Sequence, residues 1–140
     1  MKVVLDVNIW VSALLWGGLP IKILSLARQN KLTIFISESI LTELEMTLKR
    51  EKFKKQLEKR KYTVNDLILI TEDLTIKCAI FPLEVPQLRD SKDSHILATA
   101  VSANAEVLIT GDLDLLVLET FSGIVILNPS DFLNDYGFFT

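Results

Sequence analysis

The sequence predicts an α/β fold of three layers, in which a central, mostly parallel β-sheet of about five strands is flanked by helices. Short apolar runs alternate with longer segments that suit helices, a pattern typical of α/β chains. The strand-like runs are continuously apolar, which indicates strands covered on both faces. The 140 residues fit one domain, so residues 1–140 are expected to share a single core.

The chain opens with a short apolar strand over residues 3–5, which ends at Asp6. A helix is expected over residues 8–15 and ends at the glycines that begin with Gly17. A second helix is expected over residues 20–29, because proline suits the first turn of a helix, where its missing N–H is not needed.

The next strand is expected over residues 33–36, and Ser37 or Ser39 can cap the helix that follows, to about residue 50. The basic segment, defined as residues 49–61, is expected to continue as a separate helix. Another helix is expected from residue 64 to about residue 77, capped by the threonine before it.

The second half of the chain follows the same alternation, with prolines and glycines between its apolar runs. It is expected to contain strands at 79–81, 106–110 and 124–127, a loop at 83–92, and helices at 94–103, at 113–120 and from Pro129 onward. The alternation therefore supports strand–helix units along the whole chain.

The net charge of −3 hides a strong asymmetry. The basic segment holds eight of the 15 basic residues and two acids, a net charge of +6, so the other 127 residues carry −9. Local patches decide where an anionic polymer binds. Lys54, Lys55, Lys59 and Arg60 are therefore candidates for contacts with RNA phosphates, and a solvated helix face is the alternative interpretation.

The chain is expected to be cytoplasmic, without a disulfide and without a membrane span. Cys78 is the only cysteine, and its apolar neighbours favour a buried, inert thiol. The apolar N-terminus carries Asp6 early, unlike a signal peptide. We find no window of about 18 uncharged apolar residues.

Four acidic residues are expected at one edge of the sheet. Asp6 ends the first strand, Asp112 follows the fourth, Asp93 begins a helix, and Glu43 lies one turn into the helix after the second strand. Ligands of such sheets bind beyond the carboxyl ends of the strands. A divalent cation would relieve the repulsion between these carboxylates, and Mg²⁺ and Mn²⁺ prefer such oxygen ligands.

Each acid also has a structural interpretation. Asp112 could belong to a turn after Gly111 or cap a helix. Asp93 could be a favourable anion at a helix N-terminus, a role that Asp90 or Ser91 could share. Helical periodicity does not choose between Glu43 and Glu45, which flank the apolar face of their helix. Asp6 has the strongest functional indication, since an acid that ends an apolar strand must be solvated or paired.

Four segments in order resemble the motifs of PIN domains and span almost the whole chain. They are residues 3–14 with Asp6, 37–44 with Glu43, 90–97 with Asp93 and 110–116 with Asp112. The resemblance selects Glu43 over Glu45. Each motif alone is weak, whereas the ordered set is a strong indication.

The resemblance implies a nuclease with Mg²⁺ or Mn²⁺ at the acid cluster, bound by Asp6, Asp93, Asp112 and the additional acid Asp114, that cleaves RNA by metal-activated water. It implies that Asn8 orients a ligand or water. Many small members are VapC-type toxins, often homodimers, inhibited by an antitoxin protein. Val7 departs from the family, where Thr or Ser is common, and His95 receives no role from the resemblance.

Two other functions were weighed. A haloacid-dehalogenase-like phosphatase needs a second acid two residues after Asp6, where this chain has Asn8, and a lysine after its Gly-Asp pair, whereas the last lysine is Lys92. A catalytically silent PIN scaffold that binds RNA or protein would fit better if an acid were missing. Among the aromatic residues, Trp10 is the candidate for stacking on an RNA base.

Overall fold

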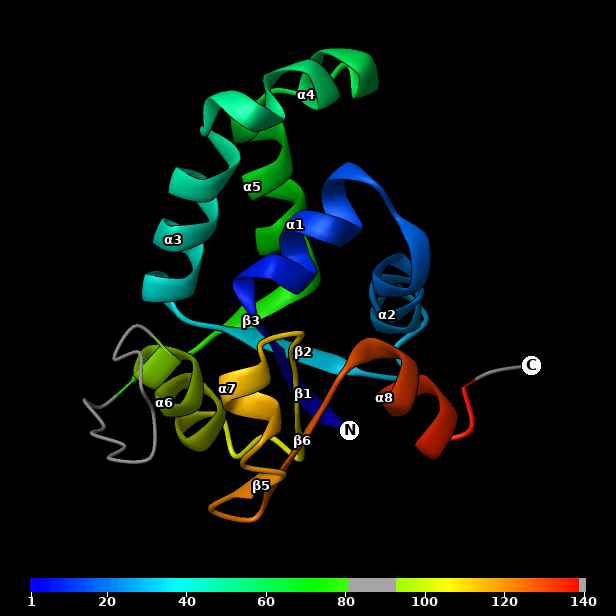
Figure 1. The fold of residues 1–140 in the computed structure, drawn as a ribbon, viewed down its shortest axis with the longest axis vertical. Coiled ribbons are helices and arrows are strands. Elements are labelled where there is room, and N and C mark those ends of the chain that lie inside the picture. Colours follow the sequence, from blue (N-terminus) through cyan, green and yellow to red (C-terminus); the bar gives the residue numbers. More distant parts are fainter. Residues whose placement is uncertain (81–92, 139–140) are drawn as a thin grey trace.

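The computed structural model describes residues 1–80 and 93–138, and within them it has the predicted three-layer α/β architecture (Figure 1). A sheet of six strands has the order β3-β2-β1-β4-β6-β5, and all neighbouring pairs are parallel except β5 and β6. The sheet lies between α1 to α5 on one side and α6 and α7 on the other (Figure 1).

The strands are short, and the two at the centre of the sheet, β1 and β4, are apolar apart from Lys2. Their bounds are β1 Lys2–Leu5, β2 Thr33–Ile36, β3 Thr75–Lys77, β4 Val107–Ile109, β5 Thr120–Phe121 and β6 Ile124–Leu127. Every residue of β4 is buried, as are the last three of β1. For β1 and β4 this confirms the inference that continuous apolar runs form strands covered on both faces, whereas in β2 and β6 buried residues alternate with half-buried ones.

One layer of helices, α1 to α5, covers one side of the sheet (Figure 1). They are α1 Val7–Leu15, α2 Gly18–Arg28, α3 Glu38–Leu48, α4 Lys54–Arg60 and α5 Val64–Leu74, with a 3₁₀ turn η1 at Glu51–Phe53. Ser37, not Ser39, caps α3, and Thr63 and Asp66 form a capping box at α5. The basic segment forms a separate helix, as predicted.

The remaining helices are α6 Ser94–Ser102, α7 Leu113–Leu116 and α8 Pro129–Asp135. The helix predicted over residues 113–120 is wrong in its second half, because α7 is one turn long. The chain then forms β5, which pairs with β6 through a tight turn in which Ser122 and Gly123 have φ of 50° and 80°. Such φ values suit a two-residue hairpin turn.

β3 begins four residues earlier than the strand that the sequence predicts. We predicted residues 79–81, but α5 ends at Leu74 and β3 occupies Thr75–Lys77. The hydroxyl of Thr75 donates to the carbonyl of Thr71 at 2.8 Å, and Ile76 pairs with Phe35 of β2. Pairing with β2 therefore ends the helix earlier than its apolar pattern suggests. The loop expected at 83–92 lies outside the described residues.

Among the described residues, no single helix has the length and apolar character needed to cross a membrane. The pair α1 and α2 meets the criterion only when taken together, by length and composition, and is bent by 94°.

Candidate functional site

The order of the strands reverses direction at β1 and β4. The chain runs outward from β1 to β2 and β3, and then returns to place β4 on the other side of β1. Such a reversal of strand order is where open α/β sheets bind ligands. Asp6 follows β1, and Thr110 and Asp112 follow β4, so these residues lie at the carboxyl ends of the two strands.

Asp6 is held in a fixed orientation at the end of β1. Its side chain caps α1, with Oδ1 accepting from the backbone N–H of Val7 at 2.7 Å. Oδ2 accepts from the hydroxyl of Thr110, also at 2.7 Å. The residue is only 8% exposed, so both oxygens of a buried carboxylate have a donor.

The surroundings raise the pKa of Asp6 above its ordinary value. Burial is the largest cause, because it disfavours the charged carboxylate. The hydrogen bonds from Thr110 and Val7 act in the opposite direction, and the negative charges of Asp112 and Glu43 raise the pKa further. An ionised Asp6 is therefore costly here unless positive charge compensates it.

Thr110 links two of the acidic segments, a role that sequence reasoning missed. Its hydroxyl donates to Asp6 and accepts from the backbone N–H of Asp112 at 3.0 Å. Asp112 in turn caps α7, and its Oδ1 accepts from the backbone N–H of Asp114 at 2.8 Å. The position of Thr110, a polar residue directly after the buried strand β4, was the feature of the sequence that could have indicated this role.

Three of the predicted metal ligands converge tightly. One carboxylate oxygen each of Asp93, Asp112 and Asp114 lies within 4.8 Å of the other two, and all three residues are partly buried. Asp93 comes from the N-terminus of α6 and the other two from the start of α7. Hard oxygen ligands at this spacing fit Mg²⁺ or Mn²⁺. Asp6, the fourth predicted ligand, is not part of this closest group, although the charge of Asp112 acts on it.

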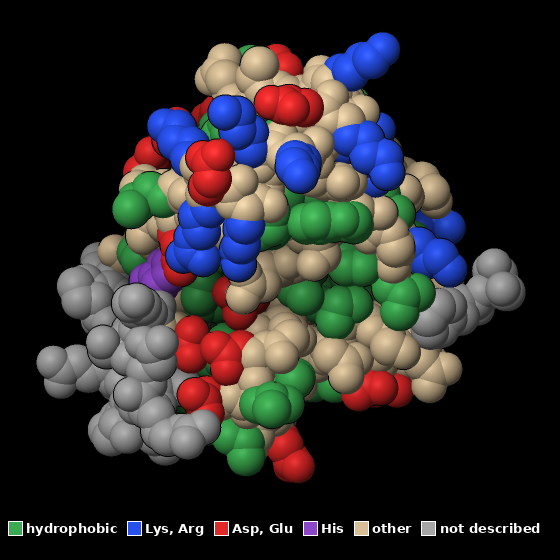
Figure 2. Space-filling view, turned by 45° about the horizontal axis from the view of Figure 1, so that its top comes forward, with side chains coloured by type: hydrophobic (Ala, Val, Ile, Leu, Met, Phe, Trp, Pro, Cys, Tyr) green, Lys and Arg blue, Asp and Glu red, His purple; other side chains and the backbone are tan. Residues whose placement is uncertain are grey.

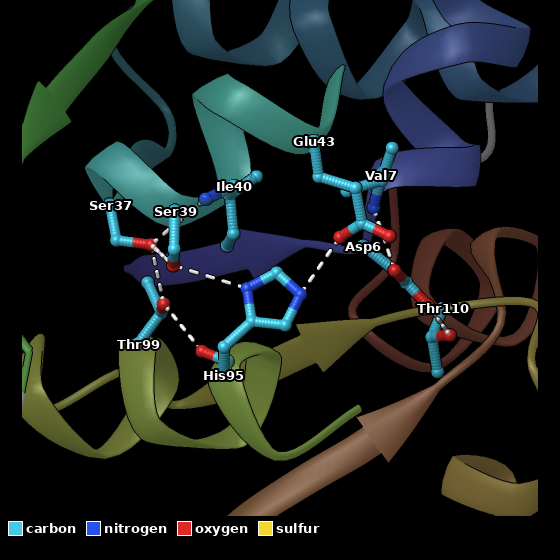
Figure 3. A network of polar contacts seen from close by, with 9 residues as sticks. All are labelled: Asp6, Val7, Ser37, Ser39, Ile40, Glu43, His95, Thr99 and Thr110. Carbon is cyan, nitrogen blue, oxygen red and sulfur yellow. Dashed lines mark hydrogen bonds and ion pairs between the residues drawn. The ribbon is translucent and has the colours of Figure 1, made fainter. Parts of the chain in front are cut away.

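Glu43 and Glu45, which helical periodicity could not separate, point to different partners. Oε2 of Glu43 on α3 lies 2.8 Å from Nε2 of His95 on α6 (Figure 3). Glu45 instead pairs with Lys49 on its own helix at 3.3 Å. Glu43 is thus the glutamate of α3 whose charge reaches Asp6, and Figure 3 shows it beside that residue.

The comparison with known families agrees with the arrangement of these acids. The PIN domain model matches residues 2–114, which include Asp6, Glu43, Asp93, Asp112 and Asp114. The chain belongs to the PIN domain family. This confirms the resemblance carried by the four sequence motifs.

Two known proteins are similar to this PIN domain over most of its length. The uncharacterized protein MJ1680 of Methanocaldococcus jannaschii is 30% identical in an alignment of 149 positions, which covers 97% of this chain and 92% of that protein. This chain also resembles a chain in the crystal structure of VapBC2 from Rickettsia felis, which is bound to a DNA fragment from the VapBC2 promoter. The TM-score is 0.62 and the sequence identity is 19%. That match covers 91% of this chain and 98% of the other, and it supports the fold.

Two residues of α1 that the sequence analysis singled out differ in accessibility. Asn8 is exposed in the first turn of α1, next to Asp6. Trp10 is fully buried in the core of the PIN domain. The proposal that Trp10 stacks on an RNA base is therefore wrong, because its ring packs inside the protein.

The basic segment includes α4, which lies at the top of the molecule in Figure 1, and Figure 2 shows the face seen when this top is turned forward. Figure 2 shows many Lys and Arg side chains over the upper part of this face and a group of acidic side chains below them. Lys54, Lys55 and Lys59 are exposed on α4. Arg60 is also exposed, but its Nε donates to the carbonyl of Leu15 at 2.9 Å, which caps the end of α1.

Proposed function

We propose that this PIN domain is a cytoplasmic, metal-dependent endoribonuclease that hydrolyses phosphodiester bonds of RNA. The observation that carries the proposal is the convergence of Asp93, Asp112 and Asp114 within 4.8 Å, next to the buried Asp6. Sites that cleave phosphodiesters use such carboxylates to bind divalent cations.

In the proposed site, Asp6, Asp93, Asp112 and Asp114 hold Mg²⁺ or Mn²⁺. The bound cation would supply an activated water and stabilise negative charge that develops on the phosphate. Asp6 and Asp112 are kept in place by the hydroxyl of Thr110. Glu43 is the acceptor for a proton of the attacking water, and Asn8 orients water or RNA from the exposed first turn of α1.

The basic segment is proposed to bind the RNA backbone. An acidic site repels RNA, so positive charge close to it favours productive binding. Lys54, Lys55 and Lys59 have no role in the core and present their charges to solvent. Arg60 would contribute as well, in addition to its contact with Leu15.

We further propose that the chain is the toxin of a toxin–antitoxin pair and forms a homodimer. The family resemblance and the fold shared with a chain of VapBC2 support this. The test is co-expression: the chain alone should arrest growth of a bacterial host, and the product of the adjacent gene should relieve the arrest. Growth arrest that the Asp6→Asn variant also causes would contradict a nuclease toxin.

The nuclease proposal is tested by incubating the purified protein with single-stranded RNA and Mg²⁺ or Mn²⁺. Cleavage should require the metal, stop in EDTA and fall below roughly one hundredth in Asp6→Asn, by analogy with the loss of one charge-stabilising group at an active site. Asp135→Asn, an exposed acid at the end of α8, is the matched control and should cleave normally.

The alternatives give different results in the same assay. Cleavage that survives EDTA and Asp6→Asn would overturn the mechanism. Hydrolysis of p-nitrophenyl phosphate without RNA cleavage would support the phosphatase. Binding of RNA without cleavage in either metal would support a silent scaffold.

A further inference from the structure

The polar contacts around His95 form a chain that joins α3 to α6 (Figure 3). Nε2 of His95 lies 2.8 Å from Oε2 of Glu43, and Nδ1 lies 3.1 Å from Oγ of Ser39. The hydroxyl of Ser39 lies 3.0 Å from that of Ser37, which lies 2.8 Å from Oγ1 of Thr99. Both ring nitrogens of His95 are therefore engaged, one by the predicted catalytic glutamate and one by a hydroxyl.

The direction of the hydrogen bonds in this chain follows from its far end. Thr99 Oγ1 lies 2.7 Å from the backbone carbonyl of His95, which can only accept, so the Thr99 hydroxyl donates there. Ser37 must then donate to Thr99, since a hydroxyl has one proton. Ser37 also accepts from the backbone N–H of Ile40 at the start of α3. The chain is thus anchored to the backbone of both helices.

The position of the Ser39 proton does not affect the contact between His95 and Glu43. Ser39 has a single proton and lies within reach of both Ser37 and Nδ1 of His95. Whichever it donates to, Nε2 faces a carboxylate oxygen and must itself carry a proton to make a hydrogen bond. His95 therefore presents an N–H to Glu43 in both arrangements.

From these contacts we infer that His95 is a positioning residue, which fixes the carboxylate of Glu43 toward the acid cluster and is itself oriented by Ser39, Ser37 and Thr99. The inference rests on the proposed nuclease function of Glu43. It goes beyond the family resemblance, which assigns no role to His95.

Glu43 needs such a partner because of where it lies. Its side chain is 42% exposed, and an exposed glutamate samples several rotamers. His95 is less exposed, at 23%, and lies on α6, whose N-terminus carries Asp93. The contact therefore couples the position of Glu43 on α3 to the helix that supplies an acid of the metal site.

A pair of substitutions separates this role from packing. The amide of glutamine reaches about as far as Nε2, whereas that of asparagine reaches about as far as Nδ1. His95→Gln should therefore keep the contact with Glu43 and retain activity within a few-fold. His95→Asn and His95→Ala should lower kcat by roughly ten- to hundredfold, the usual effect of removing a residue that orients a metal-site group, with little change in KM.

The matched control is Thr42→Ala, which removes a hydroxyl from the exposed side of α3 beside the same residues. It should leave kcat unchanged. Thermal unfolding in EDTA is measured for every variant, because a merely structural role would lower the unfolding temperature of His95→Asn and His95→Gln alike. Equal activity of the Gln and Asn variants would overturn the inference.

A measurement without RNA keeps the inference separate from the proposed function. His95 is the only histidine, so one imidazole gives all histidine side-chain NMR signals. In EDTA, a slowly exchanging Nε2–H signal is expected in the wild type and its loss in Glu43→Ala. An Nε2–H signal that Glu43→Ala leaves unchanged would overturn the inference even if the protein cleaves RNA. Absence of RNA cleavage with the NMR result as expected would overturn only the proposed function.

Discussion

The acid edge, defined as Asp6, Asp93, Asp112 and Asp114, and the basic segment carry opposite charge and differ in burial. At the acid edge, Asp6 is buried, and both of its carboxylate oxygens accept hydrogen bonds from Val7 and Thr110. In the basic segment, no residue of α4 is buried, and its lysines face solvent. Burial makes a charge sensitive to its immediate partners, whereas exposed charges act through a field that salt screens.

Substitutions in the two regions should therefore have distinct effects on folding, catalysis and RNA binding. Changes at the acid edge should alter the folding free energy, its pH dependence and catalysis together. Changes in the basic segment should alter RNA affinity and its salt dependence with little effect on folding, except at Arg60, which contacts α1.

Neutralising the basic segment should give the largest change in RNA affinity. Lys54, Lys55 and Lys59 are replaced together by Gln, and the affinity for single-stranded RNA is measured in EDTA at several salt concentrations. If each lysine binds one phosphate, the slope of log affinity against log salt should flatten by about 2. Lys31→Gln, an exposed charge before β2 at the opposite edge of the sheet, should change it far less. Unchanged affinity of the triple variant would remove RNA docking from the basic segment.

Asp6 should make folding depend on pH in a defined direction. Because burial raises its pKa in the folded protein, the native state binds this proton more tightly than the unfolded chain. Its contribution to folding is fully present below the ordinary Asp pKa and is lost as the pH rises through the raised value.

The measurement is chemical unfolding of wild type and Asp6→Asn in EDTA across this pH range. The stability of Asp6→Asn relative to the wild type should increase as the pH rises, because the variant cannot ionise. Saturating Mg²⁺ should favour the wild type again. A stability difference that does not vary with pH would show that burial of Asp6 has no electrostatic cost.

Removal of the Thr110 hydroxyl tests the link between the two acidic segments. Thr110→Val should lower the free energy of unfolding by about 1–3 kcal/mol, because the N–H of Asp112 loses its acceptor and Asp6 loses a donor. Thr110→Ser keeps the hydroxyl and should lose only the packing of one methyl group, about 0.8 kcal/mol. If the serine variant is the less stable of the two, the hydrogen bonds are not what matters at this position.

Substitution of Arg60 should have the smallest effect, a small loss of stability that substitution of the neighbouring lysine should not cause. Arg60→Gln removes the hydrogen bond to Leu15, so the free energy of unfolding should fall by about 1 kcal/mol. Lys59→Gln, which removes an adjacent exposed charge, should leave stability unchanged. The two are compared by urea unfolding, and equal stability would show that the hydrogen bond from Arg60 to Leu15 does not stabilise the fold.

The α/β class, most of the helices and the acids that approach one another could be predicted from the amino-acid sequence. Strands buried on both faces need continuous apolar runs, and such runs are visible without the structure at residues 3–5 and 107–109. The acids were recognisable because parallel strands end at a common edge. The resemblance to PIN domains then separated Glu43 from Glu45, which local periodicity could not.

Features that depend on contacts between distant segments could not be predicted from the sequence and became visible in the folded chain. The position of β3 was set by pairing with β2, and β5 exists because Thr120 and Phe121 pair with β6. The hydroxyl of Thr110 and the imidazole of His95 each join acidic segments that are far apart in the chain. Local propensity contains no information on such partners, since a hydrogen bond between distant residues exists only after the sheet has brought their strands and helices together.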